Sequence, residues 1–209
     1  MGRRFDPDGA YKKLRDRVSP GPKQSDDSHQ YNSLVYYPIL TERLSIRPLA
    51  MVDLETFVTY RQDPDIARFQ GWETTYSKNQ AIDLIESQAG SVLPGKGEWL
   101  QLAIYTLGTQ AHVGDLAIKS VEDEDSAFEI GFTIAKPHQG QGFAKEAASK
   151  LISCLASEAG AKKFIATTDS RNSASIKVLD ALGFKKNTSK GWTERFKNEL
   201  VAVDYFEIS

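Results

Sequence analysis

The chain has 209 residues, of which 40% are hydrophobic, 10% aromatic and 26% charged, and its formal net charge is −2. This composition is typical of a soluble globular protein with one large domain or two small ones. A chain of this length buries enough surface to fold without a disulfide or a structural metal. Its acidic and basic side chains nearly balance, which argues against nucleic acid or a membrane surface as a partner.

The cysteine and histidine content indicates the redox compartment and whether a metal site is expected. The single cysteine, Cys154, cannot form a disulfide within one chain, and three histidines scattered along the sequence do not suggest a metal site. No apolar run approaches the roughly 20 residues that a membrane span needs, and the first residues lack the apolar core of a signal peptide. These features predict a reduced, cytoplasmic protein without a metal.

The N-terminal segment differs in composition from the rest of the chain. It is rich in charge, poor in apolar residues and interrupted by the sequence Pro-Gly-Pro. We therefore expect a mobile charged extension over residues 1–34 and one folded domain over residues 35–209. Tyr11, Leu14 and Val18 lie at helical spacing, so a short helix that docks on another surface is the alternative for this segment.

Patterns in the first part of the domain predict a strand followed by helices. Alternating apolar residues favour a strand over 44–49, and apolar residues at helical spacing favour a helix over 54–61. Ser77 and Gln80 have the spacing of a capping box, so a further helix should begin there.

The rest of the domain predicts a mixed, mostly antiparallel sheet. Hairpin-sized links join three strands that should form an antiparallel meander over 98–107, 112–120 and 126–135. The remaining predicted elements, in chain order, are a helix over 143–160, a strand over 164–168, a helix over 172–182, and strands over 184–189 and 199–208. Together these elements predict an α/β (α+β) fold with seven strands and about four helices.

The junction between the third meander strand and the next helix carries the clearest chemical signal. Gly140 and Gly142 lie just before the helix that should start at Phe143. Glycine lets the backbone turn tightly and approach a ligand closely, and the free amides of the first helical turn attract anions. The junction therefore predicts a site for a ligand that carries phosphate.

Three kinds of phosphate loop compete for this junction. A P-loop is excluded because no Gly-Lys-Ser/Thr follows at its spacing. A dinucleotide loop has Gly140-x-Gly142 in its favour, and Asp169 would lie where a ribose-binding acid belongs. Lys145 at the position of the third glycine, together with the preceding meander, counts against it. A dinucleotide-binding oxidoreductase is therefore the weaker alternative.

The third kind of loop is supported by resemblance to a known family. Residues 139–144 have the form Gln-x-x-Gly-x-Ala, which is similar to the Gln/Arg-x-x-Gly-x-Gly/Ala motif of the GNAT superfamily of N-acetyltransferases. Residues 172–184 resemble the family's Asn-x-x-Ser/Ala helix that ends in Leu-Gly-Phe. Residues 41–44 and 129–132 resemble strands of the branch that contains the ribosomal-protein N-terminal acetyltransferases. The resemblance spans about residues 40–208 and implies the GNAT fold.

This resemblance also implies that acetyl-CoA is the cosubstrate. The loop and the first helical turn would hold its pyrophosphate, and the main chain of the preceding strand would hold its pantetheine arm. The residues expected to bind it are Ile134, Lys136, Gln139, Gly140, Gln141, Gly142, Phe143, Ala144, Asn172 and Ser175. The alternatives are a helix start without a ligand and, for Asn172, a plain helix N-cap.

Two residues are expected to catalyse the transfer. Many family members use a tyrosine to protonate the departing thiolate, but the corresponding position is Leu179 here, so we assign that role to Ser175. Glu129 is the expected base for the acceptor amine, because a half-buried carboxylate has a raised pKa. The alternatives are an ordinary first-turn residue for Ser175 and a solvated strand residue for Glu129.

The acceptor is expected to be a primary amine that attacks acetyl-CoA directly in a ternary complex. Trp72, Glu73 and Tyr76 lie where the family builds its acceptor pocket, although plain loop packing is their alternative. A protein N-terminus competes with a small amine such as an amino acid, a polyamine or an aminoglycoside. A module that binds acyl-CoA without catalysis is a further alternative, and the protein could be a monomer or a homodimer.

Overall fold

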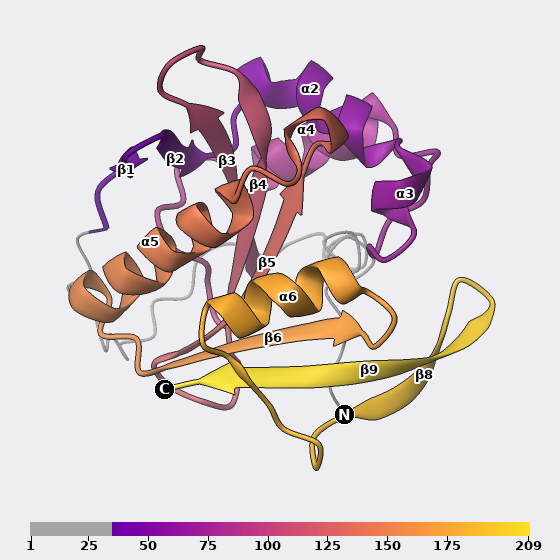
Figure 1. Cartoon of the computed structure of the whole chain (residues 1–209). Coiled ribbons are helices and arrows are strands. Elements are labelled where there is room, and N and C mark those ends of the chain that lie inside the picture. The colour runs from indigo at the N-terminus through magenta and orange to yellow at the C-terminus, as the bar shows by residue number, and fades with distance from the viewer. Residues whose placement is uncertain (1–34) are drawn as a thin grey trace, which may run out of the picture.

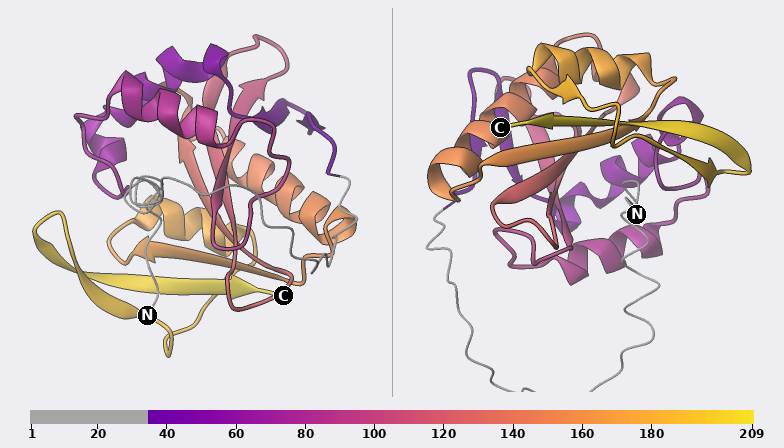
Figure 2. Two further views of the ribbon diagram at one scale, coloured as in Figure 1. Left: turned by 180° about the vertical axis from the view of Figure 1, so that it is seen from behind. Right: turned by 90° about the horizontal axis from the view of Figure 1, so that it is seen from below.

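The computed structural model describes residues 35–209 (Figure 1), so the extension predicted over residues 1–34 lies outside the described residues. These described residues form one mixed sheet with helices on both of its faces (Figure 2). The fold class predicted from the sequence is confirmed. The strand order is β1-β2-β3-β4-β5-β6-β9-β7, and β8 also pairs with β9.

The first half of the sheet is antiparallel and follows the chain order. It contains the predicted meander, and each of its strands pairs with the next one along the chain. These strands are β1 (Ile39–Leu40), β2 (Leu44–Pro48), β3 (Trp99–Thr106), β4 (His112–Ser120) and β5 (Ala127–Ile134).

Short helices connect β2 to β3 and cover one face of this half-sheet. Ser77 caps the last of them as predicted: its hydroxyl accepts from the Gln80 amide, and the Gln80 side chain accepts from the Ser77 amide. In chain order these helices are η1 (Met51–Asp53), α2 (Leu54–Arg61), α3 (Pro64–Ala67) and α4 (Lys78–Ser87). Phe57, Val58, Ala81 and Leu84 from α2 and α4 are buried against the sheet.

The second half of the chain supplies the other face and the remaining strands. Ala147, Leu151 and Leu155 of the long helix α5 pack against Phe128 and Ile130 of β5. The elements are η2 (Lys136–His138), α5 (Phe143–Glu158), β6 (Lys163–Asp169), α6 (Ser173–Ala181), β7 (Lys185–Lys186), β8 (Trp192–Phe196) and β9 (Glu199–Ile208).

The described sheet has nine strands, not the predicted seven. The two-residue β1 was not predicted, and the predicted strand over 184–189 shrinks to the two residues of β7. The other addition is β8, whose sequence Trp-Thr-Glu-Arg-Phe carries polar and charged residues on a half-exposed strand. Such a strand has no buried apolar run by which the sequence could reveal it. The described residues also contain five α-helices instead of about four, since Pro64–Ala67 forms the short α3.

The pairing between β5 and β6 is parallel and short. It joins Ala127 to Lys163, Phe128 to Phe164 and Glu129 to Ile165, and it ends there. Beyond this point β5 stays paired with β4, whereas β6 stays paired with β9. The two strands consequently diverge, and Figure 1 shows β5 and β6 running in different directions.

Gly114 on β4 allows the closest approach between neighbouring strands. A Cβ atom at this position would lie 2.1 Å from the carbonyl oxygen of Thr133 on β5. Gly114→Ala should therefore lower the free energy of unfolding by about 3 kcal/mol, because a backbone oxygen in a paired strand cannot move aside cheaply. Chemical denaturation measures this loss. Gly108→Ala is the control, since no atom lies within 4 Å of its added methyl group; equal losses in both variants would contradict the packing argument.

Candidate functional site

The junction between β5 and α5 presents a row of backbone amides that no protein group accepts. Gly140 and Gly142 have φ angles of +76° and +79°, and Gly142 is the N-cap of α5. Glu146 makes the first backbone hydrogen bond of α5, to the Gly142 oxygen at 3.0 Å. Within residues 35–209, no acceptor lies within hydrogen-bonding distance of the amides from Gln141 to Lys145. Free amides at a helix start, with the positive end of its dipole, form an anion site.

Side chains from other elements hold this loop in shape. Arg43, just before β2, donates through Nη2 to the Gln141 oxygen at 3.1 Å and lies over the Phe143 ring, 4.8 Å from its centroid. The same guanidinium forms an ion pair with Glu146 at 2.5 Å, and the hydrogen bonds that Glu146 accepts from Thr41 and Arg43 oppose desolvation and hold its pKa below the ordinary value. The sequence revealed the loop but gave Arg43 no role, because this contact joins segments about one hundred residues apart.

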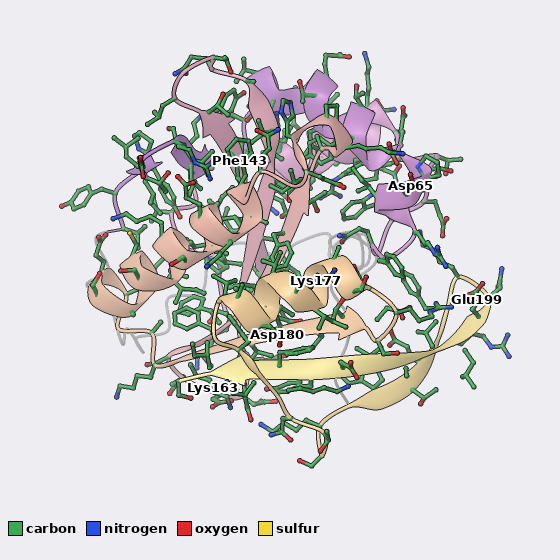
Figure 3. All side chains as sticks on the ribbon, viewed as in Figure 1. Asp65, Phe143, Lys163, Lys177, Asp180 and Glu199 are labelled. Carbon is green, nitrogen blue, oxygen red and sulfur yellow. The ribbon has the colours of Figure 1, made fainter. Side chains whose placement is uncertain are left out.

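Two residues predicted to bind the cosubstrate have side chains engaged within the protein. Gln139 donates through Nε2 to the Ile134 oxygen at 2.8 Å. Lys136 on η2 pairs with Asp65 on α3. Figure 3 shows Asp65 on α3 and Phe143 at the start of α5. If these residues bind acetyl-CoA, the Gln139 side chain does so indirectly by bracing the loop, and Lys136 does so through its main chain.

The divergence of β5 and β6 opens a cleft that brings together three predicted residues. Glu129 comes from β5, Asn172 precedes α6, and Ser175 lies in the first turn of α6. The full lining comprises Phe69, Gln70, Glu129, Ile130, Gly131, Phe132, Ala166, Thr167, Thr168, Asn172, Ser175 and Leu179. The sequence predicted Glu129, Asn172 and Ser175 among these residues; it gave no sign of Phe69 and Gln70, which follow α3.

Asn172 is a helix cap and also lines the cleft. Its Oδ1 accepts from the Ser175 amide at 3.1 Å, which satisfies one of the free donors at the start of α6. No acceptor within residues 35–209 is hydrogen-bonded to its Nδ2 or to the Ser175 hydroxyl. Leu179 is buried in the same cleft. Both polar groups are therefore available to a ligand, whereas the leucine can offer only apolar contact.

Glu129 is buried on the sheet face that carries α2 and α4. Its side chain accepts from the Thr167 hydroxyl at 3.1 Å and lies 3.6 Å from Lys119 Nζ. Burial raises the pKa of Glu129, and the positive charge of Lys119 and the hydrogen bond from Thr167 oppose that rise. A buried carboxylate with raised proton affinity suits a general base. Only the strand register places Lys119 and Thr167 beside it, so the sequence did not reveal them.

The three residues predicted for the acceptor pocket differ in burial: Trp72 and Tyr76 are buried, and Glu73 is exposed. Trp72 and Tyr76 are 2% and 1% exposed and pack with Phe57, so their rings form part of the core below the surface. Glu73 is exposed and lies 3.5 Å from Lys197 Nζ.

Lys197 fastens the β8–β9 hairpin to the segment between α3 and α4. Its Nζ donates to the Ala67 oxygen at 2.8 Å and to the Trp72 oxygen. This contact places the hairpin tip beside the segment that contributes Phe69 and Gln70 to the cleft wall. The segment that contributes Phe69 and Gln70 to the cleft is thus tied to the β8–β9 turn through Lys197.

Comparison with known proteins identifies the family. The family described as "Acetyltransferase (GNAT) domain" matches residues 43–185, which include the loop and all the residues that line the cleft. The chain belongs to the GNAT acetyltransferase family. It is therefore an N-acetyltransferase-type enzyme, and the predictions of fold and enzyme class are confirmed.

Relatives and solved structures agree with this membership. The chain is 27% identical over 170 residues to the N-acetyltransferase p20 of Bacillus licheniformis, covering 81% of this chain and 94% of that protein. The spermidine N-acetyltransferase of Vibrio cholerae, in complex with CoA and spermine, superposes with a TM-score of 0.69 at 16% identity, covering 80% of this chain and 96% of that one.

RimL, the ribosomal L7/L12 alpha-N-protein acetyltransferase in complex with CoA, has a TM-score of 0.66 at 17% identity, covering 82% and 96% of the two chains. These neighbours have different acceptors, so the likeness establishes the fold and leaves the acceptor open.

Residues 35–209 lack two further features. No helix there is both long and apolar enough to cross a membrane. The same residues contain no cluster of three or more His, Cys, Asp or Glu side chains that could hold a metal ion. Cys154, the single cysteine, is buried on α5.

Gly142→Val should abolish binding of acetyl-CoA. Valine disfavours the φ of +79° at this N-cap, and its side chain would project beside the free amides, with its Cβ 3.7 Å from Arg43 Nη2. Titration calorimetry with acetyl-CoA measures the loss, and circular dichroism checks the fold. Gly108→Val is the matched control on an exposed turn and should bind normally. Retained affinity in Gly142→Val would refute the assignment of the loop.

Proposed function

We propose that this enzyme transfers an acetyl group from acetyl-CoA to a primary amine by direct attack within a ternary complex. The proposal rests on two features that lie next to each other. A loop of free amides lies at the end of β5, and the cleft beside β5 holds Glu129, Asn172 and Ser175. An anion site next to a base and hydrogen-bond donors is what acyl transfer from a phosphate-bearing carrier requires.

Acetyl-CoA supplies the activated acetyl group as a thioester. The amides from Gln141 to Ala144 bind its pyrophosphate, and Gly140 and Gly142 keep that surface free of side chains. The pantetheine arm lies along the edge of β5 that β6 has left, between Ile130 and Lys136. Since the Ile134 oxygen already accepts from Gln139, the other main-chain groups of this edge make the contact. Asn172 adds a donor from its Nδ2.

Glu129 removes the proton from the acceptor amine, directly or through one water molecule. An alkylammonium has a pKa above neutrality, so a base of raised pKa assists its deprotonation. Lys119 and Thr167 orient this carboxylate. Ser175 donates a hydrogen bond to the sulfur as the amine displaces it, and main-chain amides of β5 stabilise negative charge on the carbonyl oxygen.

The acceptor belongs to one of two classes, a protein N-terminus or a small amine. The relatives named above act on different acceptors, so their names do not decide between these classes. We place the acceptor between β5 and the segment from Phe69 to Tyr76. Glu73 lies at its exposed edge, and Trp72 and Tyr76 support this wall from beneath.

A thiol-release assay with acetyl-CoA and a panel of amines and N-terminal peptides tests the proposal. We expect release of CoA that depends on at least one amine. Tight binding of CoA without turnover of any amine would identify a binding module without catalysis.

Glu129→Gln should lower kcat/KM by about a hundredfold or more, because the variant cannot accept the proton. The thermal stability of this variant should not fall together with its activity. Burial raises the pKa of Glu129 above its ordinary value of 4.5, so this group stabilises the fold at low pH and loses that contribution as pH rises through the folded pKa. At pH 7 the glutamine variant should therefore have an equal or higher Tm than the wild type.

Rate and thermal unfolding as functions of pH measure both effects. The wild-type rate should fall on the acid side as Glu129 becomes protonated, and this limb should be absent from the residual activity of Glu129→Gln. Glu86→Gln, on the exposed side of α4, is the control and should change neither quantity. A loss of stability at pH 7 together with a loss of activity would mean that Glu129 is structural.

A further inference from the structure

Arg61, the last residue of α2, has a buried guanidinium without a hydrogen-bond acceptor. Its exposed fraction is 0%, and within residues 35–209 its Nε, Nη1 and Nη2 atoms have no hydrogen-bond partner. Arginine cannot lose its charge in a protein, and it has five N–H donors. A group of this kind is expensive to bury alone, so its position calls for an acceptor.

The neighbours of Arg61 do not supply this acceptor. Its Cζ lies 3.8 Å from the ring centroid of Trp72, 4.0 Å from that of Phe57 and 4.8 Å from that of Tyr76. Ring faces attract the charge but do not replace the hydrogen bonds of five N–H groups. The surroundings stabilise a cation and leave its donors for another partner.

Asp115 on β4 interacts with Arg61 electrostatically, but no hydrogen bond joins the two side chains. Its Oδ1 accepts instead from the Tyr60 hydroxyl at 2.6 Å. Burial raises the pKa of Asp115, which weakens its hold on the charge of Arg61. The aspartate is therefore a counter-charge and not the bound partner of the guanidinium.

Arg61 is not among the residues that line the cleft, but its neighbours connect it to that lining. Asp115, which its charge reaches, is paired with Thr133 on β5, on the same face of that strand as Gly131. Gly131 lines the cleft, and two residues along a strand span about 7 Å. The rings of Trp72 and Tyr76 that cover Arg61 belong to the segment whose beginning, Phe69 and Gln70, also lines the cleft.

The segment that covers Arg61 contains no helix or strand, although the rings of Trp72 and Tyr76 are buried. Residues 71–77 have no regular secondary structure. Hydrogen bonds that hold them include those from Trp72 Nε1 to the Arg61 oxygen at 2.9 Å, from Gln62 Nε2 to the Tyr76 oxygen at 2.9 Å, and from Lys197 to the Trp72 oxygen. A shift of this segment would open a path between Arg61 and the cleft.

We propose that Arg61 binds a carboxylate of the acceptor, so that the substrates are primary amines that also carry a carboxylate. The inference rests on the proposed acetyl transfer and specifies its substrate class. Guanidinium and carboxylate pair through two parallel hydrogen bonds, which would satisfy the donors that the protein leaves empty. The carboxylate comes either from a free amino acid or from the acidic first side chain of a peptide. A polyamine meets repulsion from the same cation.

Matched pairs of acceptors test the proposal on the wild-type enzyme. One arm compares alanine with alaninamide, and the other compares a tripeptide that begins with Asp with one that begins with Asn. Spermidine is the cationic comparison. In one of the two arms the carboxylate member should have a kcat/KM about 10-fold to 100-fold higher. Alaninamide has the more easily deprotonated amine. Amine basicity alone would therefore favour alaninamide over alanine, which is the opposite of the preference expected in the first arm.

Variants at position 61 assign the preference to the guanidinium. Arg61→Met should reduce the ratio between the paired acceptors to about one, leave the KM for acetyl-CoA unchanged, and keep or raise the Tm because a buried charge is removed. Arg61→Lys keeps the charge without the planar fork and should lower the ratio several-fold. Arg195→Met, on the exposed side of β8, is the matched control and should change none of these quantities.

The outcomes separate this proposal from the function on which it rests. Turnover of amines without a preference for the carboxylate member would overturn the role of Arg61 and mean that buried water satisfies its donors. An unchanged ratio in the folded Arg61→Lys or Arg61→Met protein would do the same. No turnover with any amine would overturn the acetyl transfer and the carboxylate site together.

Discussion

The parallel ladder between β5 and β6 ends at Glu129 and Ile165, and the whole site depends on that ending. If the two strands stayed paired, β6 would occupy the edge of β5 that we assign to the pantetheine arm. Their divergence is maintained from both sides, because β4 continues to pair with β5 while β9 continues to pair with β6. The cleft is consequently a property of the sheet topology, and binding does not have to create it.

Charge pairs around the cleft keep its two walls in place. Arg43 and Glu146 join the edge of β2 to the first turn of α5, and Lys197 joins the β8–β9 turn to the α3–α4 segment. Both contacts involve backbone carbonyls as well as side chains, so they position main chain. A pyrophosphate at the loop therefore meets backbone groups that are already ordered, which lowers the entropic cost of binding.

Local sequence signals predicted those parts of the site that local physics determines. Glycine spacing revealed the loop, Ser77 and Gln80 revealed a helix start, and alternation revealed the buried strands. The partners of Glu129 could not be predicted, because Lys119 and Thr167 reach it only through the register of β4 and β6. The strand β8 was missed for a related reason, since its sequence has no apolar run and it forms only by pairing with β9.

The burial of Trp72 and Tyr76 gives both rings a structural role that the sequence did not predict. Sequence reasoning placed both rings at the acceptor pocket, yet in the structure they enclose Arg61 and leave the surface to their neighbours. Glu129 and Arg61 are thus opposite charges buried near one sheet face, and each is desolvated at a cost to stability. A zwitterionic acceptor, with an amine for the first and a carboxylate for the second, would compensate both charges at once.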